Sequence, residues 1–382
     1  MVALVLPFSH ATLQAALRRY LAQPSLEVGE VVPKKLGGGF SGSPVYKLKI
    51  VYQVESGDHS ELNLVFKEGG QSAGTISYSV SGREAHFYRT LAPDLPVRTP
   101  SMVLNAYDDL VVGSGRHDSF VVGSGATYPG ASVAAGDWVL IEALPQEGVW
   151  PQTQWNKQNY ADAITTLAQL HAHRWAKPPD LSTHPWMWEP AGMHAHAAAV
   201  QARHALLEIE AAQWGSKFFT PEELREWLAL LDNPDPLLNI LNSSPQTLIH
   251  GDYWPGNIAL KSPAYDTDGS RMAVFDWQFV GIGPAAYDLS CFHSTSRWWF
   301  GRLPYSLSEM RALYLQELNG LLGYKVNSAL STACLDAARA WRFATFWPSI
   351  IMQYSPFLLA RHSYLRSMVL EPALASLRRC MA

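Results

Sequence analysis

HGDYWPGN at residues 250–257 and VFDWQ at residues 274–278 form the most specific pattern in this sequence. The first string contains Asp252 and Asn257, five residues apart on a loop that should follow an apolar strand. The second string places Asp276 at the end of another apolar segment. The order and spacing of these polar residues argue against a chance pair of Asp-containing turns, so all three are candidate site residues.

The apolar segments beside these strings predict two short strands. We expect Thr247–His250 and Met272–Phe275 to pair as a hairpin that is joined through a loop at Tyr265–Ser270. Such a hairpin would bring the three polar side chains to one place.

The three residue types suit phosphoryl transfer. This chemistry needs a carboxylate that orients the attacking hydroxyl and accepts its proton, and oxygen ligands that hold Mg²⁺ against the phosphate oxygens. Asp252 can face a substrate while the amide oxygen of Asn257 turns toward a metal ion. Asp276 would place a carboxylate beside the same ion.

These strings resemble the aminoglycoside phosphotransferase and choline kinase-like superfamily, whose fold is similar to that of protein kinases. HGD stands where protein kinases carry HRD, and DWQ stands where they carry DFG. The resemblance implies that Asp252 is the catalytic base and that Asn257 and Asp276 bind Mg²⁺. It also implies that Asp288, in GPAAYDLSCF, braces the catalytic loop and that His250 shapes it, a role as second proton acceptor being less favoured.

A glycine-rich segment nearer the N-terminus, LGGGFSGSPVYKLKI, is a second candidate phosphate site. Gly37, Gly39 and Gly42 have GxGxxG spacing, which also occurs in Rossmann folds. A Rossmann loop opens into a helix, whereas this one runs into the alternating pattern at 45–52, which predicts a strand. By resemblance, this loop, with Ser41 included, covers the phosphates of ATP, although the Ser-Pro that follows departs from the usual pattern.

Lys67 and Glu84 complete the pattern expected of the kinase-like N-lobe. Lys67 ends the apolar segment NLVFK, where a kinase holds the lysine that touches the α- and β-phosphates. Glu84 lies on the following predicted helix and would pair with that lysine. Ser81 is expected to cap this helix in a capping box with Glu84. The alternatives are a solvated lysine at a strand end and an ordinary helix carboxylate.

WVLIEALP at residues 138–145 resembles the hinge of the same superfamily. Backbone groups from Glu142 to Leu144 would hold the adenine edge, and this leaves ATP and GTP both open as donors. The preceding segment 111–136 is rich in Gly and Ser and repeats VVGSG. We interpret it as a solvated hairpin or loop, with a functional lid as the alternative.

The expected fold is α+β, a two-lobed protein kinase-like fold with a small antiparallel β N-lobe and a larger, mainly helical C-lobe. Residues 1–144 should form the N-lobe, with a helix at 11–21 and strands that include 62–67 and 97–104. Residues 145–382 should form the C-lobe, which holds the catalytic loop, the metal site and the acceptor pocket. The resemblance itself covers roughly residues 35 to 294.

The composition fits a packed globular enzyme. The chain has 382 residues, 48% hydrophobic and 16% charged, with a formal net charge of −4. This charge gives no basic field of the kind that nucleic acid attracts, so nucleic acid is not an expected partner. The widely spaced Cys291, Cys334 and Cys380 predict buried thiols rather than a disulfide framework or a zinc site.

One long apolar run, FATFWPSIIMQYSPFLLA at residues 343–360, approaches the length that spans a membrane. Pro348 and Pro356 interrupt it and Gln353 lies inside it, so we expect broken, buried helices and no membrane span. The N-terminal residues lack a charged leader. A cytoplasmic location is therefore expected.

The acceptor is expected to be a hydroxylated small molecule. Trp298 and Trp299, in STSRWWFGR, are possible walls for an apolar or quaternary-ammonium acceptor, with core packing as the favoured alternative. An aminoglycoside pocket would need clustered carboxylates, and the C-lobe offers only Glu222 and Glu223 as an acidic run. An antibiotic acceptor is therefore not favoured.

Three functions fit these residues. The favoured one is an ATP- and Mg²⁺-dependent phosphotransferase that moves the γ-phosphoryl group to a small-molecule hydroxyl. A nucleotide-binding pseudokinase would be expected to lack Asp252, Asn257, Asp276 or Lys67, and all four are present. A protein kinase-like enzyme is disfavoured because GIGPAAYDLS follows Asp276 almost at once and leaves no long activation segment.

Overall fold

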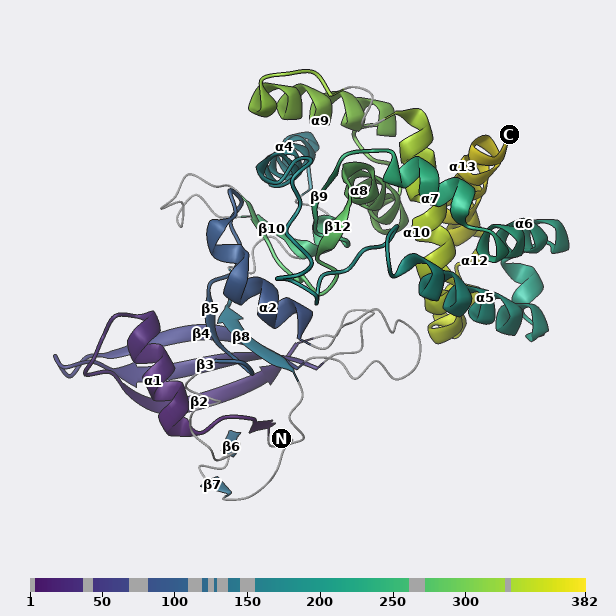
Figure 1. Ribbon diagram of the computed structural model, residues 1–382. Coiled ribbons are helices and arrows are strands. Elements are labelled where there is room, and N and C mark those ends of the chain that lie inside the picture. Colours follow the sequence, from purple (N-terminus) through teal and green to yellow (C-terminus); the bar gives the residue numbers. More distant parts are fainter. Residues whose placement is uncertain are drawn as a thin grey trace. The chain divides into compact units, whose positions relative to one another are not determined.

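The chain divides into two compact units, which are described separately here (Figure 1). The computed structural model describes residues 4–36, 44–68, 82–108, 119–122, 127–128, 137–144, 155–260, 272–326 and 331–382. The first unit comprises the described residues up to Leu144, apart from Asp94–Arg98, and the second comprises that short segment and the described residues after Pro145.

An antiparallel sheet forms the centre of the first unit. Among the described residues it has five strands in the order β2-β3-β4-β8-β5. These strands are β2 (Glu27–Lys35), β3 (Val45–Gln53), β4 (His59–Glu68), β5 (Met102–Asn105) and β8 (Trp138–Glu142). The predicted strands at 45–52 and 62–67 are confirmed, whereas the one predicted at 97–104 begins only at Met102.

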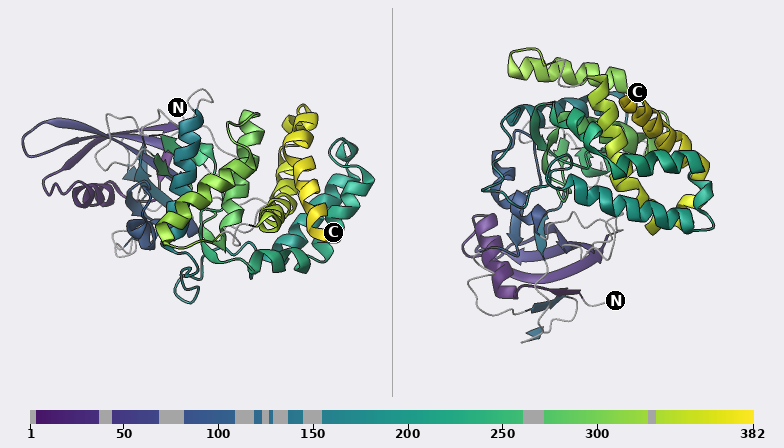
Figure 2. Two further views of the ribbon diagram at one scale, coloured as in Figure 1. Left: turned by 90° about the horizontal axis from the view of Figure 1, so that it is seen from above. Right: turned by 45° about the vertical axis from the view of Figure 1, so that its right-hand side comes forward.

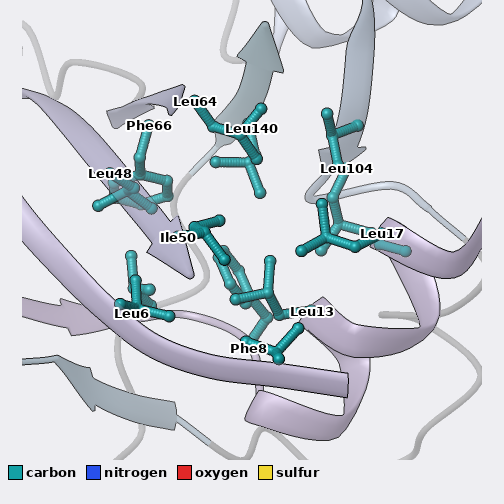
Figure 3. Close-up of a cluster of buried hydrophobic side chains, with 14 of the residues drawn as sticks. Leu6, Phe8, Leu13, Leu17, Leu48, Ile50, Leu64, Phe66, Leu104 and Leu140 are labelled. Atoms are coloured by element: carbon teal, nitrogen blue, oxygen red, sulfur yellow. The ribbon is translucent and has the colours of Figure 1, made fainter. Parts of the chain in front are cut away.

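Helix α1 (His10–Tyr20) packs on this sheet and closes the core of the unit. Its Leu13 and Leu17 point into this core, where Leu13 lies near Ile50 of β3 and Leu17 lies beside Leu104 of β5 (Figure 3). Lys49, between those two strand residues, is exposed, as the alternating pattern predicts. Full burial of a side chain such as leucine contributes about 1.5–3 kcal/mol, so these contacts hold the helix against the sheet.

A second, smaller sheet in the first unit has the order β1-β6-β7. It joins β1 (Leu4–Leu6), which the sequence analysis did not anticipate, to β6 (Ser119–Val122) and β7 (Thr127–Tyr128). The last two strands pair antiparallel within the Gly- and Ser-rich segment, where a hairpin or loop was expected. Most of that segment lies outside the described residues.

The predicted start of helix α2 (Arg83–Thr90) is wrong. Its N-cap is Gly82, which has a left-handed φ of +81°, and no side-chain cap is seen among the described residues. Ser81 itself lies outside the described residues. Glu84 forms an ion pair with Lys67, and whether it also takes part in the expected capping box lies outside the described residues.

The second unit is mainly helical, with α10 (Thr332–Gln353) at its centre. Four helices contact α10 along its length: α5 (Ala195–Ala211), α7 (Asp235–Asn242), α8 (Ala285–Phe300) and α13 (Glu371–Met381). In Figure 2 these green, teal and yellow helices gather around it. The remaining helices are α4 (Lys157–His173), α6 (Pro221–Asp232), α9 (Leu307–Leu322), α11 (Ser355–Leu359), α12 (His362–Leu365) and the π-helical turn η8 (Arg366–Leu370).

The long apolar run does not break where expected. Helix α10 continues through Pro348, and the chain turns only at Tyr354, before α11 with Pro356 in its first turn. A proline inside a helix removes one backbone hydrogen bond and crowds the preceding turn. Here the burial of neighbours such as Trp347 and Ile351 outweighs that cost. None of the described helices is long and apolar enough to cross a membrane.

The strand pairing predicted for the second unit is wrong. Strand β9 (Gln246–Ile249) pairs with β12 (Gly281–Pro284), and β11 (Met272–Val274) pairs with β10 (Ile258–Leu260). The short apolar segment directly after Asn257 takes the place expected for β9. Strand β12 is hard to recognise because GIGP lacks an alternating pattern. The connecting loop expected at 265–270 lies outside the described residues.

The cysteines match the prediction in part. Cys291 and Cys334 are buried thiols, whereas Cys380 is half-exposed, and all three are free.

Candidate active site

The HGD turn connects β9 to the short 3₁₀ helix η5 (Pro255–Asn257). Gly251 has a φ of +81°, and a Cβ there would collide with the backbone carbonyl of Phe279. Only glycine adopts this conformation at low cost. The turn therefore depends on Gly251, which directs the next residue, Asp252, out of the strand.

Asp288 braces this turn from the first turn of α8. Its carboxylate accepts the backbone N–H of His250 at 2.7 Å and that of Gly251 at 2.8 Å. The side chain is fully buried and also accepts a bond from Nε2 of His171 at 3.2 Å. Burial acts to raise the pKa of Asp288, but the bonds and charge of His171 and the bond from His250 outweigh it, so the net pKa is lowered. The carboxylate therefore stays ionised and holds the turn.

The His250 side chain connects two parts of the loop by hydrogen bonds. Its Nε2 donates to the carbonyl of Phe275 at 3.0 Å, and its Nδ1 accepts the backbone N–H of Asp252 at 3.2 Å. Burial lowers the pKa of this imidazole. A neutral ring has one donor and one acceptor, and both are engaged, so the geometry favours the loop-shaping role over proton transfer.

Asp252 is held on both carboxylate oxygens and still reaches the surface. Oδ1 accepts from Nη2 of Arg342 at 2.5 Å, and Oδ2 accepts from Nδ2 of Asn257 at 3.0 Å. The thiol of Cys291 lies 3.7 Å from Oδ1. The side chain is 16% exposed, so a second molecule can still approach the carboxylate.

Asn257 and Asp276 are brought together through the backbone. The N–H of Phe275, one residue before Asp276, donates to the carbonyl of Asn257 at 3.0 Å. Nδ2 of Asn257 donates to the carbonyl and to Oδ2 of Asp252, at 2.9 and 3.0 Å. With the amide nitrogen fixed in this way, Oδ1 is the atom of Asn257 that remains for a cation.

Asp276 has a left-handed backbone with a φ of 62°, uncommon outside glycine. Such strain concentrates at functional sites because the surrounding structure must impose it. Its neighbour Trp277 is fully buried and donates from its indole nitrogen to the carbonyl of Val274 at 3.0 Å, which anchors the turn.

The residues present fit a magnesium ion. In the described part of the chain, no cluster of three or more His, Cys, Asp and Glu side chains could hold a metal by itself. Mg²⁺ bound with a nucleotide uses one or two protein oxygens and takes its other ligands from phosphate and water. The amide oxygen of Asn257 and the carboxylate of Asp276 meet that requirement.

Lys67 and Glu84 form an ion pair within the first unit. Nζ of Lys67, on β4, lies 2.6 Å from a carboxylate oxygen of Glu84, on α2. The two side chains are only 12% and 11% exposed, which excludes the alternative of a solvated lysine at a strand end. The glycine loop expected to complete this unit, with Gly37, Gly39, Ser41 and Gly42, lies outside the described residues.

The predicted hinge contains backbone groups that are already engaged. Glu142 donates its N–H to the carbonyl of Ser101 at 2.8 Å and accepts the N–H of Ser101 on its carboxylate at 3.2 Å. Ala143 donates its N–H to the carbonyl of Asn63 at 3.2 Å. Among the described residues, the backbone N–H groups of Glu142 and Ala143 therefore already have partners.

The sequence analysis missed Arg342, which lies on α10 and reaches the HGD turn. Besides its contact with Asp252, it donates from Nη1 to the carbonyl of Gly251 at 2.6 Å. The available signal was a lone cation directly before the long apolar run. No local motif connects this position to residue 252, ninety residues earlier.

The tryptophans of the predicted acceptor segment have different environments. Trp298 is 3% exposed and packs against Trp347 and Tyr364, as the core-packing alternative states. Trp299 is half-buried and stacks on Trp254 of the catalytic loop, with ring centroids 5.8 Å apart and planes within 15°.

The acidic pair Glu222 and Glu223 is engaged within the chain. Glu222 binds Arg225 on the same helix, and Glu223 binds Arg366. These partners weaken the case for a carboxylate site that would bind a polyamine antibiotic.

Comparisons with known proteins bear on the fold and the family of this chain. No curated protein sequence matches the chain. An amicoumacin kinase in complex with AMP-PNP, Ca²⁺ and Ami superposes with a TM-score of 0.54 at 15% identity, covering 94% of this chain and 95% of that one. An ethanolamine kinase from Plasmodium vivax gives 0.53 at 11% identity, with 93% and 84% covered. A choline kinase from Streptococcus pneumoniae gives 0.51 at 14% identity, with 97% and 100% covered.

These likenesses confirm the predicted kinase-like fold, with an antiparallel sheet in one lobe and helices in the other. The model of the phosphotransferase enzyme family matches residues 50–320, well over half of the chain. The protein is therefore a member of the phosphotransferase enzyme family.

Proposed function

We propose that the protein is an ATP- and Mg²⁺-dependent phosphotransferase that moves the γ-phosphoryl group to a hydroxyl of a small molecule. One observation carries the proposal. The partly exposed carboxylate of Asp252 accepts a hydrogen bond from the side-chain amide of Asn257, and the backbone carbonyl of Asn257 accepts the N–H of Phe275, the residue before Asp276. A base and two oxygen ligands for a cation thus come from two segments, 252–257 and 275–276, that are joined by a backbone hydrogen bond.

Asp252 would orient the acceptor hydroxyl and take its proton as the new O–P bond forms and the bond to ADP breaks. Asn257 and Asp276 would hold Mg²⁺, which when bound neutralises charge on the phosphate oxygens. Because this transfer passes through a loose transition state, most of the rate comes from positioning and charge stabilisation. The buried brace from Asp288 to the HGD turn serves that positioning.

The first unit would supply the nucleotide contacts. Lys67, held by Glu84, is proposed to contact the α- and β-phosphates, and the glycine loop with Gly37, Gly39, Ser41 and Gly42 to cover them. The backbone from Glu142 to Leu144 is proposed to meet the nucleobase, with the N–H of Leu144 as donor. An amicoumacin kinase of the same fold was solved with an ATP analogue and a divalent cation, which supports this assignment.

A small-molecule acceptor fits better than a peptide. Strand β12 begins at Gly281 and α8 at Ala285, so the chain after Asp276 passes directly into regular structure. A protein kinase-like enzyme would need a longer segment there. Solved relatives of this fold are kinases of choline and ethanolamine by their names, which supports testing these alcohols first. Trp299, rather than the buried Trp298, is the tryptophan that an acceptor can reach.

The experiment that tests the nucleotide site is calorimetric titration of ATP, with and without Mg²⁺. Wild-type protein should bind only with Mg²⁺, and Asp276→Ala should lose this binding because the ion loses a charged ligand. Asp232→Ala is the matched control, since it removes an exposed carboxylate that only pairs with Arg203. Absence of binding by wild-type protein to both ATP and GTP would contradict the proposal.

The second candidate function is a pseudokinase that binds nucleotide without transferring phosphate. It predicts the same nucleotide binding in this titration. The two functions are distinguished by measuring ADP release with choline, ethanolamine or water as acceptor. A pseudokinase would release no more ADP than Asp252→Asn.

A further inference from the structure

We infer that Arg342 positions the catalytic base: its guanidinium holds Asp252 so that Oδ2, and not Oδ1, faces the acceptor. This inference rests on the proposed role of Asp252. It assigns a function to a residue of the C-terminal helical region, beyond residues 50–320 that match the family model.

The first step of the argument is the pair of contacts that one planar group makes. Nη2 of Arg342 donates to Oδ1 of Asp252 at 2.5 Å, and Nη1 donates to the carbonyl of Gly251 at 2.6 Å. One contact fixes the carboxylate, and the other fixes the backbone of the residue before it. Together they prevent rotation of the Asp252 side chain relative to the loop.

The guanidinium is itself held in place. It lies over the rings of Tyr287 and Phe346, with centroids 5.6 and 4.9 Å from Cζ. The arginine side chain is 7% exposed, and α10 packs against α8, which also carries the brace Asp288. A group held in this way loses little conformational freedom when the reaction occurs, which is what a positioning residue requires.

The two oxygens of Asp252 consequently differ. Oδ1 accepts from Arg342 and lies 3.7 Å from the Cys291 thiol, so both of its lone pairs have neighbours. Oδ2 accepts, among the described residues, only from Asn257. One lone pair of Oδ2 therefore remains for the proton of the acceptor hydroxyl.

The catalytic loop itself lacks a cation. No Lys or Arg occurs between residues 250 and 260, so the nearest positive side chain seen at the base comes from α10. A buried ion pair by itself is weak evidence for stability, because desolvation offsets much of the attraction. The position of Arg342 at the proposed catalytic base, Asp252, favours a role in the reaction.

The competing explanation is that Arg342 only stabilises the fold. Three substitutions separate the two: Arg342→Ala, Arg342→Lys and, as matched control, Arg339→Ala. Arg339 lies one turn earlier on α10, is largely buried, and donates to Ser376 rather than to the catalytic loop. The assay is release of labelled phosphate from γ-labelled ATP with Mg²⁺ and water as acceptor, which needs no identified substrate.

Arg342→Ala should lower kcat by about 10²–10³-fold and leave KM for ATP within about threefold, because the base is misplaced while nucleotide contacts remain. Added guanidinium at low millimolar concentration should restore part of that rate, and should restore nothing to Asp252→Asn. The kcat of Arg342→Lys should lie between those of wild type and Arg342→Ala, since an ammonium group cannot bridge both acceptors in a plane. Arg339→Ala should retain the wild-type kcat.

Wild-type kcat in Arg342→Ala would overturn the inference. So would a loss that guanidinium does not rescue and that comes with weakened ATP binding, because that result describes a purely structural residue. If Arg342→Ala does not fold, the test uses Arg342→Lys instead. A wild-type kcat in that variant would also overturn the inference. Transfer that persists in Asp252→Asn would instead contradict the proposed function, on which this inference rests.

Discussion

At the scale of single residues, the candidate site combines the local HGD motif with a distant contact, from Arg342 on α10 to Asp252. Asp252, Asn257 and Asp276 were expected to lie together through a hairpin of the two neighbouring strands. That pairing is wrong, and the residues are joined instead by the Asn257–Asp252 side-chain bond and by the backbone bond from Phe275 to Asn257. Arg342 was not expected, because its contact with Asp252 depends on how α10 packs. Sequence spacing carries no information about that packing.

Gly251 gives the first prediction at this scale. Gly251→Ala should destabilise the protein by about 1–3 kcal/mol, because a left-handed alanine is strained and its Cβ meets the carbonyl of Phe279. Denaturant unfolding measures the loss. Gly320→Ala is the control, since no described atom outside its own helix would lie within 4 Å of the new Cβ. That change should stabilise α9 by up to about 1 kcal/mol, and equal destabilisation by both would contradict the account.

His293 gives a prediction on pH. Burial, and then the charges of Arg339 and Arg297, lower its pKa to about 3. In the unfolded chain a histidine titrates near pH 6.5. Between these values the unfolded state binds the extra proton, so stability should be full above about pH 6.5 and should fall as the pH drops toward 3.

The measurement is the denaturant midpoint of wild-type protein and His293→Phe at pH 7.5 and pH 5. The substitution removes the titrating group, so the variant should lose less stability between the two pH values. His204→Gln is the control, because it removes a histidine whose side chain is 75% exposed. The same pH dependence in His293→Phe and wild type would show that His293 is not the group responsible.

At the scale of elements, regular patterns predicted the strands and helices, and contacts outside each element overrode several boundaries. β3 and β8 follow the alternating and apolar patterns expected of them. The helix was expected to end near Pro348, but α10 continues through it because neighbouring elements pack around α10. The predicted pairing of β9 was wrong because strands of three or four residues carry too little pattern to identify their partner.

Helix α6 gives the prediction at this scale. Glu223 closes a capping box with Thr220 and also binds Arg366, through two bonds of 2.7 and 2.9 Å. Glu223→Gln should destabilise the protein by about 1–3 kcal/mol, because the buried side chain at position 223 loses its charge-assisted bonds with the partly buried Arg366. Glu222→Gln, which removes an exposed pair with Arg225, should cost under about 0.5 kcal/mol. Thermal unfolding of the two variants compares them directly, and equal melting temperatures would contradict the assigned role of Glu223.

At the scale of the whole molecule, the two-part organisation follows from the sequence order, strands first and helices after. The family match and the solved structures of similar fold agree with that order. The acceptor could not be predicted in the same way. The side chains near the proposed site come from distant segments, such as Trp299 on α8 and Trp254 beside the HGD turn, and no local pattern indicates their stacking.

Ligand binding gives the prediction for the whole molecule. Mg²⁺ and ATP together should raise the melting temperature, since a ligand at about 100 times its Kd stabilises the folded state by about 2.7 kcal/mol. A chelator added to the same sample should reverse the shift. ATP that stabilises the protein equally well after chelation would exclude the proposed metal site at Asn257 and Asp276.

The most direct test of the account is transfer by Asp252→Asn compared with wild type. The measurement is phosphate or ADP release from Mg²⁺-ATP, with calorimetric titration of the nucleotide alongside. The account predicts that the variant binds Mg²⁺-ATP nearly as well as wild type while transfer falls by about 10²–10⁴-fold, since the base is lost and the nucleotide contacts remain. Undiminished transfer by Asp252→Asn would contradict the central claim that this carboxylate is the catalytic base.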